Sequence, residues 1–222
     1  MENNQPIGIL DSGVGGLTVV KEIFRQLPHE EVIYFGDSAR LPYGPRPAEE
    51  VVQFTMEIVD FLINFHVKMI VIACNTATAL ALEKVKKEID IPVVGVIRPG
   101  SVAAIKNTKT GKIGIIGTDG TIKSGAYEKC LSKINPKLVI KSQACPALVP
   151  LVENGNYSDK EIRNIVSNAL TPIKGYDIDA LILGCTHYPL ISSYIQEVVG
   201  EQVKLLSSAE ETAREVSTIL HF

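Results

Sequence analysis

Two cysteines occupy matching places in this chain of 222 residues. Cys74 lies in the segment VIACNT and Cys185 in the segment LILGCTH, and each follows a short apolar run typical of a buried strand. Ligands of open α/β sheets bind beyond the carboxyl ends of the strands. A thiol at the start of the next helix also feels the positive end of the helix dipole, which favours the thiolate and lowers the pKa. Both thiols are therefore candidates for chemistry.

Two thiols that approach one carbon from opposite sides suit the inversion of a stereocentre. One thiolate removes the α-proton from one face of the carbon, and the other thiol delivers a proton to the opposite face. An unperturbed cysteine has a pKa of about 8.5, and lowering it by two units needs about 2.7 kcal/mol of differential stabilisation. The active form needs one thiolate and one thiol.

A second interpretation uses Cys185 alone as a nucleophile, with His187 as its base. This would be a cysteine hydrolase, although catalytic dyads usually bring the base from elsewhere in the fold. Cys130 and Cys145 carry no motif, and we expect both to be small buried hydrophobic residues.

Apolar runs and segments of helical periodicity alternate along the whole chain. The expected strands are Ile7–Leu10, Val32–Phe35, Met69–Ala73, Val93–Val96, Ile113–Ile116, Leu138–Lys141, Ala180–Leu183 and Val203–Leu206. The expected helices are Leu17–Leu27, Glu49–Asn64, Ala77–Ile89, Ser101–Lys106, Ser124–Ile134, Lys160–Ile173, Leu190–Val199 and Ala209–Leu220. This alternation predicts a doubly wound α/β fold with mostly parallel sheets covered by helices on both faces.

The two halves of the chain resemble each other. The segment IGILDSG at Ile7 resembles IGIIGT at Ile113, 106 residues later, and Cys74 precedes Cys185 by 111 residues. Two pairs of similar segments in the same order predict two similar lobes with the active site in the cleft between them. We place residues 1–97 and a returning segment 208–222 in the first lobe, and residues 98–207 in the second.

The glycine-rich segment DSGVGGL begins at Asp11, after a strand and before a helix. It is not a dinucleotide fingerprint because Thr18 stands where the third glycine would be, and it lacks the Gly-Lys-Ser/Thr of a Walker loop. Its backbone N–H groups at a helix N-terminus would suit a small anion such as a carboxylate. The alternative is a turn that only lets the helix pack closely.

The remaining polar candidates are weaker. The rigid segment LPYGPRP, residues 41–47, is either a simple crossover or a loop at the rim of the cleft. Glu153 reads as a solvated helix acid, and His29, His66 and His221 read as surface or packing residues.

Composition excludes several classes of function. The net charge is −3 without a basic run, so no nucleic-acid partner is expected. No apolar stretch reaches the roughly 18 residues of a membrane span, and the N-terminus does not read as a signal peptide. No cluster of Cys and His has the spacing of a metal site. We therefore expect a cytoplasmic protein with reduced thiols.

Several motifs together resemble the bacterial glutamate racemases of the aspartate/glutamate racemase family. They are DSGVGGLTV, PYG, ACNTATA, GVIRPG, GIIGT and LGCTHYPL, spread from Ile7 to about Glu215. The resemblance implies interconversion of L- and D-glutamate without pyridoxal phosphate, metal or any other cofactor. It also implies a role in supplying D-glutamate for peptidoglycan, and a homodimer.

The resemblance also implies roles for individual residues. Cys74 and Cys185 would be the two acid/base thiols. The substrate-binding residues would be Asp11, Ser12, Tyr43, Gly44, Asn75, Thr76, Thr118, Thr121, Thr186 and His187, with the two threonines at 118 and 121 on its carboxylate. Asp11, Glu153 and His187 would tune the thiols or the substrate ammonium.

Three alternatives remain open at this point. Related aspartate racemases usually carry Glu after Cys-Thr, so His187 favours glutamate over aspartate or another amino acid. Members of the family typically continue for several dozen residues past the segment that ends at Leu220, and that tail packs on the first lobe. A shortened homologue would bind glutamate with little turnover, which is the second alternative, and the cysteine hydrolase is the third.

Overall fold

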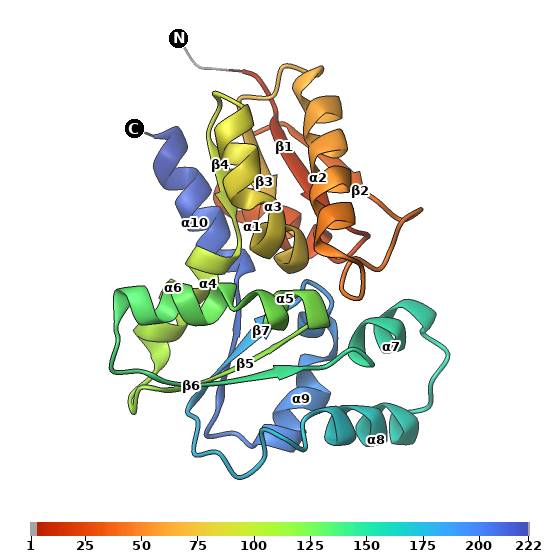
Figure 1. The fold of residues 1–222 in the computed structure, drawn as a ribbon, viewed down its shortest axis with the longest axis vertical. Helices are drawn as coiled ribbons and strands as arrows, with labels where there is room; N and C mark the ends of the chain where they lie inside the picture. The colour runs from red at the N-terminus through yellow and green to blue at the C-terminus, as the bar shows by residue number, and fades with distance from the viewer. Residues whose placement is uncertain (1–3, 222) are drawn as a thin grey trace.

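The computed structural model describes residues 4–221, and both ends of the predicted first lobe, residues 1–3 and 222, lie outside them. In this part of the chain, the strands form two separate four-stranded sheets in which every pairing is parallel. The first sheet lies in the upper half of Figure 1 and the second in the lower half. The predicted α/β fold with parallel sheets is confirmed.

The first sheet has the strand order β2-β1-β3-β4. Its strands are β1 (Ile7–Asp11), β2 (Val32–Gly36), β3 (Met69–Ile72) and β4 (Val93–Gly95). The central strands β1 and β3 are buried along their whole length, as their sequences IGILD and MIVI require. Helix α1 (Leu17–Gln26) covers one face, and helices α2 (Ala48–Ile63) and α3 (Asn75–Glu88) cover the other.

The second sheet repeats this pattern with the order β6-β5-β7-β8. Its strands are β5 (Lys112–Gly117), β6 (Val139–Ala144), β7 (Ala180–Gly184) and β8 (Lys204–Ser207). Helices α4 (Ile97–Asn107) and α6 (Ala126–Ile134) pack on one face, and α7 (Leu148–Asn154), α8 (Asp159–Ala169) and α9 (Ser192–Val199) pack on the other. In both sheets the first strand lies between the second and the third, so the two sheets have the same strand order.

The eight predicted strands are all present, and their ends differ from the prediction by at most three residues. Three short elements were not predicted: α5 (Asp119–Ser124), α7 and the 3₁₀ turn η1 (Tyr188–Ile191). Each has seven residues or fewer, which is too short for a helical period to stand out. Helix α4 begins four residues before the predicted start because Pro99 lies in its first turn, where a missing N–H costs no hydrogen bond.

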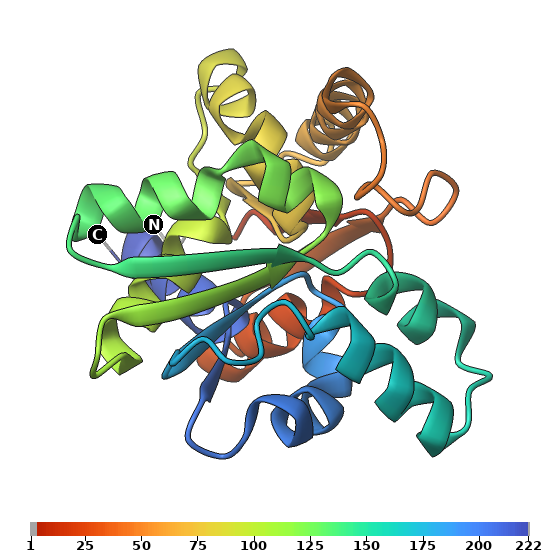
Figure 2. The same cartoon turned by 60° about the horizontal axis from the view of Figure 1, so that its bottom comes forward.

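The last helix, α10 (Ala209–Leu220), returns to the first sheet after β8 and packs against α1 and α4. Figure 1 shows it in blue beside the first sheet, and in Figure 2 it is partly hidden behind the green segments of the second half. Ala213 and Val216 belong to the same apolar cluster as Val19 and Ile23 of α1. This packing agrees with a returning segment from residue 208, and the lobe boundary at residues 97 and 98 stays a prediction.

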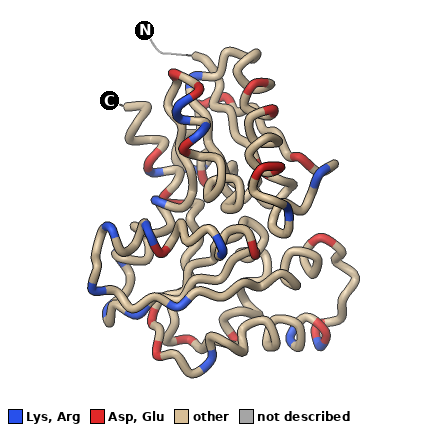
Figure 3. The backbone as a smooth tube through the Cα atoms, in the orientation of Figure 1, with Lys and Arg blue, Asp and Glu red and all other residues tan. Residues whose placement is uncertain are grey.

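Charged residues of both signs are spread over both halves of the backbone (Figure 3). No helix within the described residues is long and apolar enough to cross a bilayer.

Candidate functional site

The strand ends that carry the two cysteine motifs, one in each half of the chain, meet at one small cavity. Its walls come from the residues after β1, β3, β5 and β7, together with the loop 41–44. The cavity measures about 20 Å³. A water molecule needs about 10–15 Å³ on this measure, so an amino acid enters only when part of the wall moves.

Ten of the thirteen residues singled out from the sequence line this cavity. They are Ser12, Tyr43, Gly44, Cys74, Asn75, Thr76, Thr118, Cys185, Thr186 and His187. The other three do not line the cavity but hydrogen-bond to residues that do. Asp11 accepts from Thr186, and Glu153 bonds to His187. Thr121 bonds to Thr76 and Thr118. The sequence argument missed the wall residue Val149, an apolar residue of α7 with no signal of its own.

Cys74 is the N-cap of α3. Its sulfur accepts a hydrogen bond from the backbone N–H of Ala77 at 3.4 Å. The Cys74 thiol in turn donates to the Ser12 hydroxyl oxygen at 3.7 Å. The sequence thus places the thiol where a helix needs an acceptor. Cys74 reaches the cavity from the first sheet.

Cys185 reaches the same cavity from the second sheet, at the end of β7. Its sulfur lies 3.7 Å from Nδ1 of His187, and Nε2 of His187 forms an ion pair with Glu153. Glu153 is an exposed residue of helix α7, as predicted for a solvated helix acid, and it also pairs with the His187 ring. The turn after β7 brings Cys185 and His187 within reach of each other, although they are only two residues apart in the sequence.

The expected lowering of the thiol pKa values is wrong for both cysteines. Burial raises the pKa of Cys74 to about 11, with a further rise from the nearby Asp11 carboxylate. Burial also raises the pKa of Cys185 well above its usual range, and the nearby Cys74 and Asp11 add to the rise. Donors such as the Ala77 N–H act in the predicted direction, but the loss of water outweighs them.

The glycine-rich loop holds an internal carboxylate. Asp11, at the end of β1, accepts the Gly13 N–H at 3.0 Å and the Thr186 hydroxyl at 3.2 Å. The anion predicted for this loop is thus supplied by the chain. Burial raises the pKa of Asp11 to about 6, although the Gly13 N–H and the charge of His187 oppose the rise. Gly15 lets the other half approach, because a Cβ there would lie 2.5 Å from Oγ1 of Thr186.

Three threonine hydroxyls form a triangle between the two halves. Oγ1 of Thr76 lies 2.8 Å from that of Thr118 and 3.2 Å from that of Thr121, and the last two are 3.0 Å apart. Thr118 is also the N-cap of α5. Hydroxyls can both donate and accept, so this buried triangle can turn its donors toward a carboxylate.

The loop 41–44 is held by hydrogen bonds to both halves of the molecule. The Tyr43 hydroxyl donates to Asp37 at 2.5 Å, and Arg40 donates to the same carboxylate at 2.6 Å. The Gly120 N–H donates to the Gly44 carbonyl at 2.9 Å. The segment is therefore a wall of the cavity as well as a crossover. Asp37 was not predicted, because an aspartate two residues past a strand resembles any turn residue.

Asn75 is held by the opposite half. Its Oδ1 accepts a hydrogen bond from the hydroxyl of Tyr127, on α6, at 2.7 Å. Among residues 4–221, its Nδ2 is the one buried side-chain nitrogen or oxygen without a hydrogen-bond partner.

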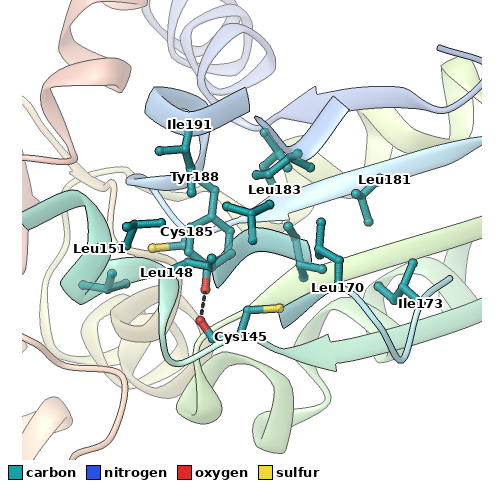
Figure 4. Close-up of a cluster of buried hydrophobic side chains, with 14 of the residues drawn as sticks. Cys145, Leu148, Leu151, Leu170, Ile173, Leu181, Leu183, Cys185, Tyr188 and Ile191 are labelled. Carbon is teal, nitrogen blue, oxygen red and sulfur yellow. Dashed lines mark hydrogen bonds between the residues drawn. The ribbon is translucent and has the colours of Figure 1, made fainter. Parts of the chain in front are cut away.

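The other two cysteines lie away from the cavity. Cys145 is buried in the core of the second half, as predicted, and accepts the Tyr188 hydroxyl on its carbonyl (Figure 4). Its sulfur and that of Cys185 point in different directions from the Tyr188 ring. Cys130 is only partly buried, against the cluster on α6. Within the described part of the chain, no three His, Cys, Asp or Glu residues gather as metal ligands would.

This chain is similar in sequence and in fold to several known glutamate racemases. A glutamate racemase from Bacillus cereus is 57% identical over 221 residues, which is all of this chain and 82% of that protein. The crystal structure of a glutamate racemase isoform from Bacillus anthracis superposes with a TM-score of 0.96 at 54% identity, over 100% of this chain and 83% of that one. The structure of the Francisella tularensis glutamate racemase in complex with D-glutamate has a TM-score of 0.91 at 37% identity, over 98% and 81%.

The family model of the Asp/Glu/Hydantoin racemases matches residues 7–216. This match spans both sheets and every residue that lines the cavity. The chain therefore belongs to the Asp/Glu/Hydantoin racemase family.

Proposed function

We propose that this chain is a glutamate racemase that interconverts L- and D-glutamate by proton transfer between Cys74, Cys185 and the α-carbon. The observation that carries the proposal is that both sulfurs reach one cavity from two different parallel sheets. We choose glutamate as the substrate because the similar proteins are named glutamate racemases, and the structure of one of them was solved in complex with D-glutamate.

The two thiols need opposite protonation states when the substrate is bound. Because burial raises the pKa of Cys74 to about 11, both thiols are mainly protonated in the closed cavity. The substrate brings a positive ammonium group, which stabilises a thiolate beside it. His187 lies 3.7 Å from the Cys185 sulfur, and when it is paired with the Glu153 carboxylate as an imidazolium its positive charge favours a thiolate on Cys185.

The polar wall divides naturally between the charged groups of glutamate. Asp11, buried behind Thr186, supplies negative charge for the ammonium. The threonine triangle and the Asn75 amide supply donors for a carboxylate. A cavity of about 20 Å³ requires the loop 41–44 or the two halves to move apart for entry and release.

The experiment follows purified protein by circular dichroism with each enantiomer of glutamate and of aspartate, and by proton NMR in deuterated water. We expect wild-type protein to racemise glutamate, and Cys74→Ala and Cys185→Ala to lose racemisation while still binding glutamate. Each variant should exchange the α-proton of one enantiomer only, with opposite preferences. Cys145→Ala is the matched control, because this thiol is buried away from the cavity.

Three outcomes would count against the proposal. Full racemisation by either single variant rejects the two-base assignment. Turnover of aspartate in preference to glutamate moves the substrate to the related amino acid. Burst release from an activated ester that depends on Cys185 but not on Cys74 favours the hydrolase.

The cellular expectations extend this proposal. A racemase of this kind would supply D-glutamate for peptidoglycan in the cytoplasm and would act as a homodimer, as the family resemblance implies. Rescue of a D-glutamate auxotroph tests the first expectation, and light scattering of the purified protein tests the second.

A further inference from the structure

The Asn75 amide is satisfied at one end only. Its oxygen accepts a hydrogen bond, whereas its buried Nδ2 has no partner within residues 4–221. Asn75 lines the same cavity as the two cysteines. A buried N–H₂ group without an acceptor is unfavourable, so a ligand that brings an acceptor into the cavity would remove this penalty.

A single group determines which end of this amide is free. An amide can turn over to exchange its oxygen and nitrogen, but the Tyr127 hydroxyl donates to Oδ1 at 2.7 Å. The phenol is fully buried, and burial raises its pKa, so the hydroxyl keeps its proton and remains a donor. Its ring is fixed, since a Cβ at Gly100 would lie 3.1 Å from the Tyr127 oxygen and a Cβ at Gly184 would lie 3.2 Å from its ring.

We propose that Tyr127 is a positioning residue that holds the Asn75 amide with Nδ2 as the free end, so that it donates to a carboxylate of the substrate. The inference deepens the proposed function, on which it rests, because it assumes an amino-acid substrate. If the amide turned over, its oxygen would face the carboxylate and repel it.

This contact also joins the two halves of the molecule. Asn75 is the first residue of α3, on the first sheet, and Tyr127 belongs to α6, on the second. The amide is therefore oriented only while the halves are together. Binding of the carboxylate is thereby coupled to closure of the cavity.

The test is a double-mutant cycle of Tyr127→Phe and Asn75→Ala, with KM and kcat measured in both directions and D-glutamate binding measured by calorimetry. Removing one neutral hydrogen bond should raise KM and Kd by about 2- to 12-fold, with a smaller change in kcat. Asn75→Ala should raise both constants further. In the Asn75→Ala background, Tyr127→Phe should have no additional effect, because Tyr127 acts only through the amide.

Tyr188→Phe is the matched control, since it also removes a buried phenol hydrogen bond, to the Cys145 carbonyl at 3.0 Å. We expect its KM to equal that of wild-type protein. A purely structural role of Tyr127 would instead multiply the two effects in the double variant, and that result overturns the inference.

A second variant keeps the inference testable if Tyr127→Phe does not fold. Asn75→Asp retains an acceptor for Tyr127 but has no N–H₂, so glutamate binding should be lost; an unchanged KM in Asn75→Asp overturns the inference. Absence of racemisation and of glutamate binding in wild-type protein would instead refute the proposed function itself.

Discussion

Replacing Asp11 by Asn should stabilise the protein while it abolishes activity. The folded pKa of Asp11 rises from its ordinary 3.8 to about 6, chiefly because of burial. The folded state therefore holds the proton more tightly than the unfolded chain. The stability that this provides is present below the unfolded pKa and is lost as the pH rises through the folded pKa.

The rise corresponds to about 3 kcal/mol of stability that is present at low pH and has been lost by neutral pH, since one pKa unit is worth about 1.4 kcal/mol. An amide cannot ionise, so Asp11→Asn avoids this loss. About 2 kcal/mol of the difference between variant and wild type should develop between about pH 4.5 and about pH 7.5. The remainder develops at lower pH.

The measurement is urea unfolding of both proteins across this pH range, beside a racemase assay. The free energy of unfolding of Asp11→Asn should increase relative to that of the wild type as the pH rises. Its turnover should be lost, because the negative charge proposed to stabilise the substrate ammonium is gone. Asp179→Asn is the control of opposite sign. Although burial opposes it, hydrogen bonds from Thr108, Lys109 and Thr110 lower the pKa of Asp179, so this variant should be less stable than the wild type by an amount that stays constant across this pH range and shrinks only below the ordinary pKa of 3.8.

A stability difference between Asp11→Asn and wild type that does not change with pH would refute this reasoning. It would mean that the Asp11 carboxylate is well solvated or fully compensated by the loop around it. A variant that keeps full activity would show that the charge of Asp11 is not needed by the substrate.

Three further substitutions test the walls of the cavity. Asp37→Asn removes the charge from the acceptor of Tyr43 and should raise KM for glutamate by about 2- to 10-fold, as loss of one neutral hydrogen bond would. Gly15→Ala should lower both activity and stability, because its Cβ would lie 2.5 Å from Oγ1 of Thr186 and force the halves apart; full activity contradicts that close approach. Cys145→Ala should retain turnover and lose about 1–3 kcal/mol in urea unfolding, as small core truncations do, and a large loss of turnover would place this thiol in the site.

The sequence predicted the sheets because the strands are the part of the chain where one signal dominates. Runs such as MIVI and LILG are buried on both faces, and nothing in them competes with an extended conformation. The similarity of the two halves was also predicted from the chain, through the matching positions of Cys74 and Cys185, whereas the order of strands within each sheet was not. Most of the cavity could be predicted for the same reason, since parallel strand ends share one edge of a sheet.

What the sequence could not show depends on contacts between distant residues. Val149 and Tyr127 reach the site through packing of α7 and α6, and no local pattern marks them. The role of Asp37 depends on the path of the loop that returns Tyr43 above it. The direction of the thiol pKa was predicted wrongly because the helix dipole can be read from the chain, whereas the extent of burial cannot.

The high thiol pKa is itself useful for this chemistry. The α-proton of an amino acid is very weakly acidic, so its removal needs a thiolate, whereas a thiol whose pKa is about 11 stays protonated and unreactive while the cavity holds no substrate. The difficulty is that such a thiolate is rare at neutral pH. A positive charge about 4 Å away is worth about 4 kcal/mol at an effective dielectric constant of about 20, which raises the thiolate population roughly a thousandfold. The substrate ammonium would thus create the base where it is needed, and the closed cavity would keep the thiols inert until then.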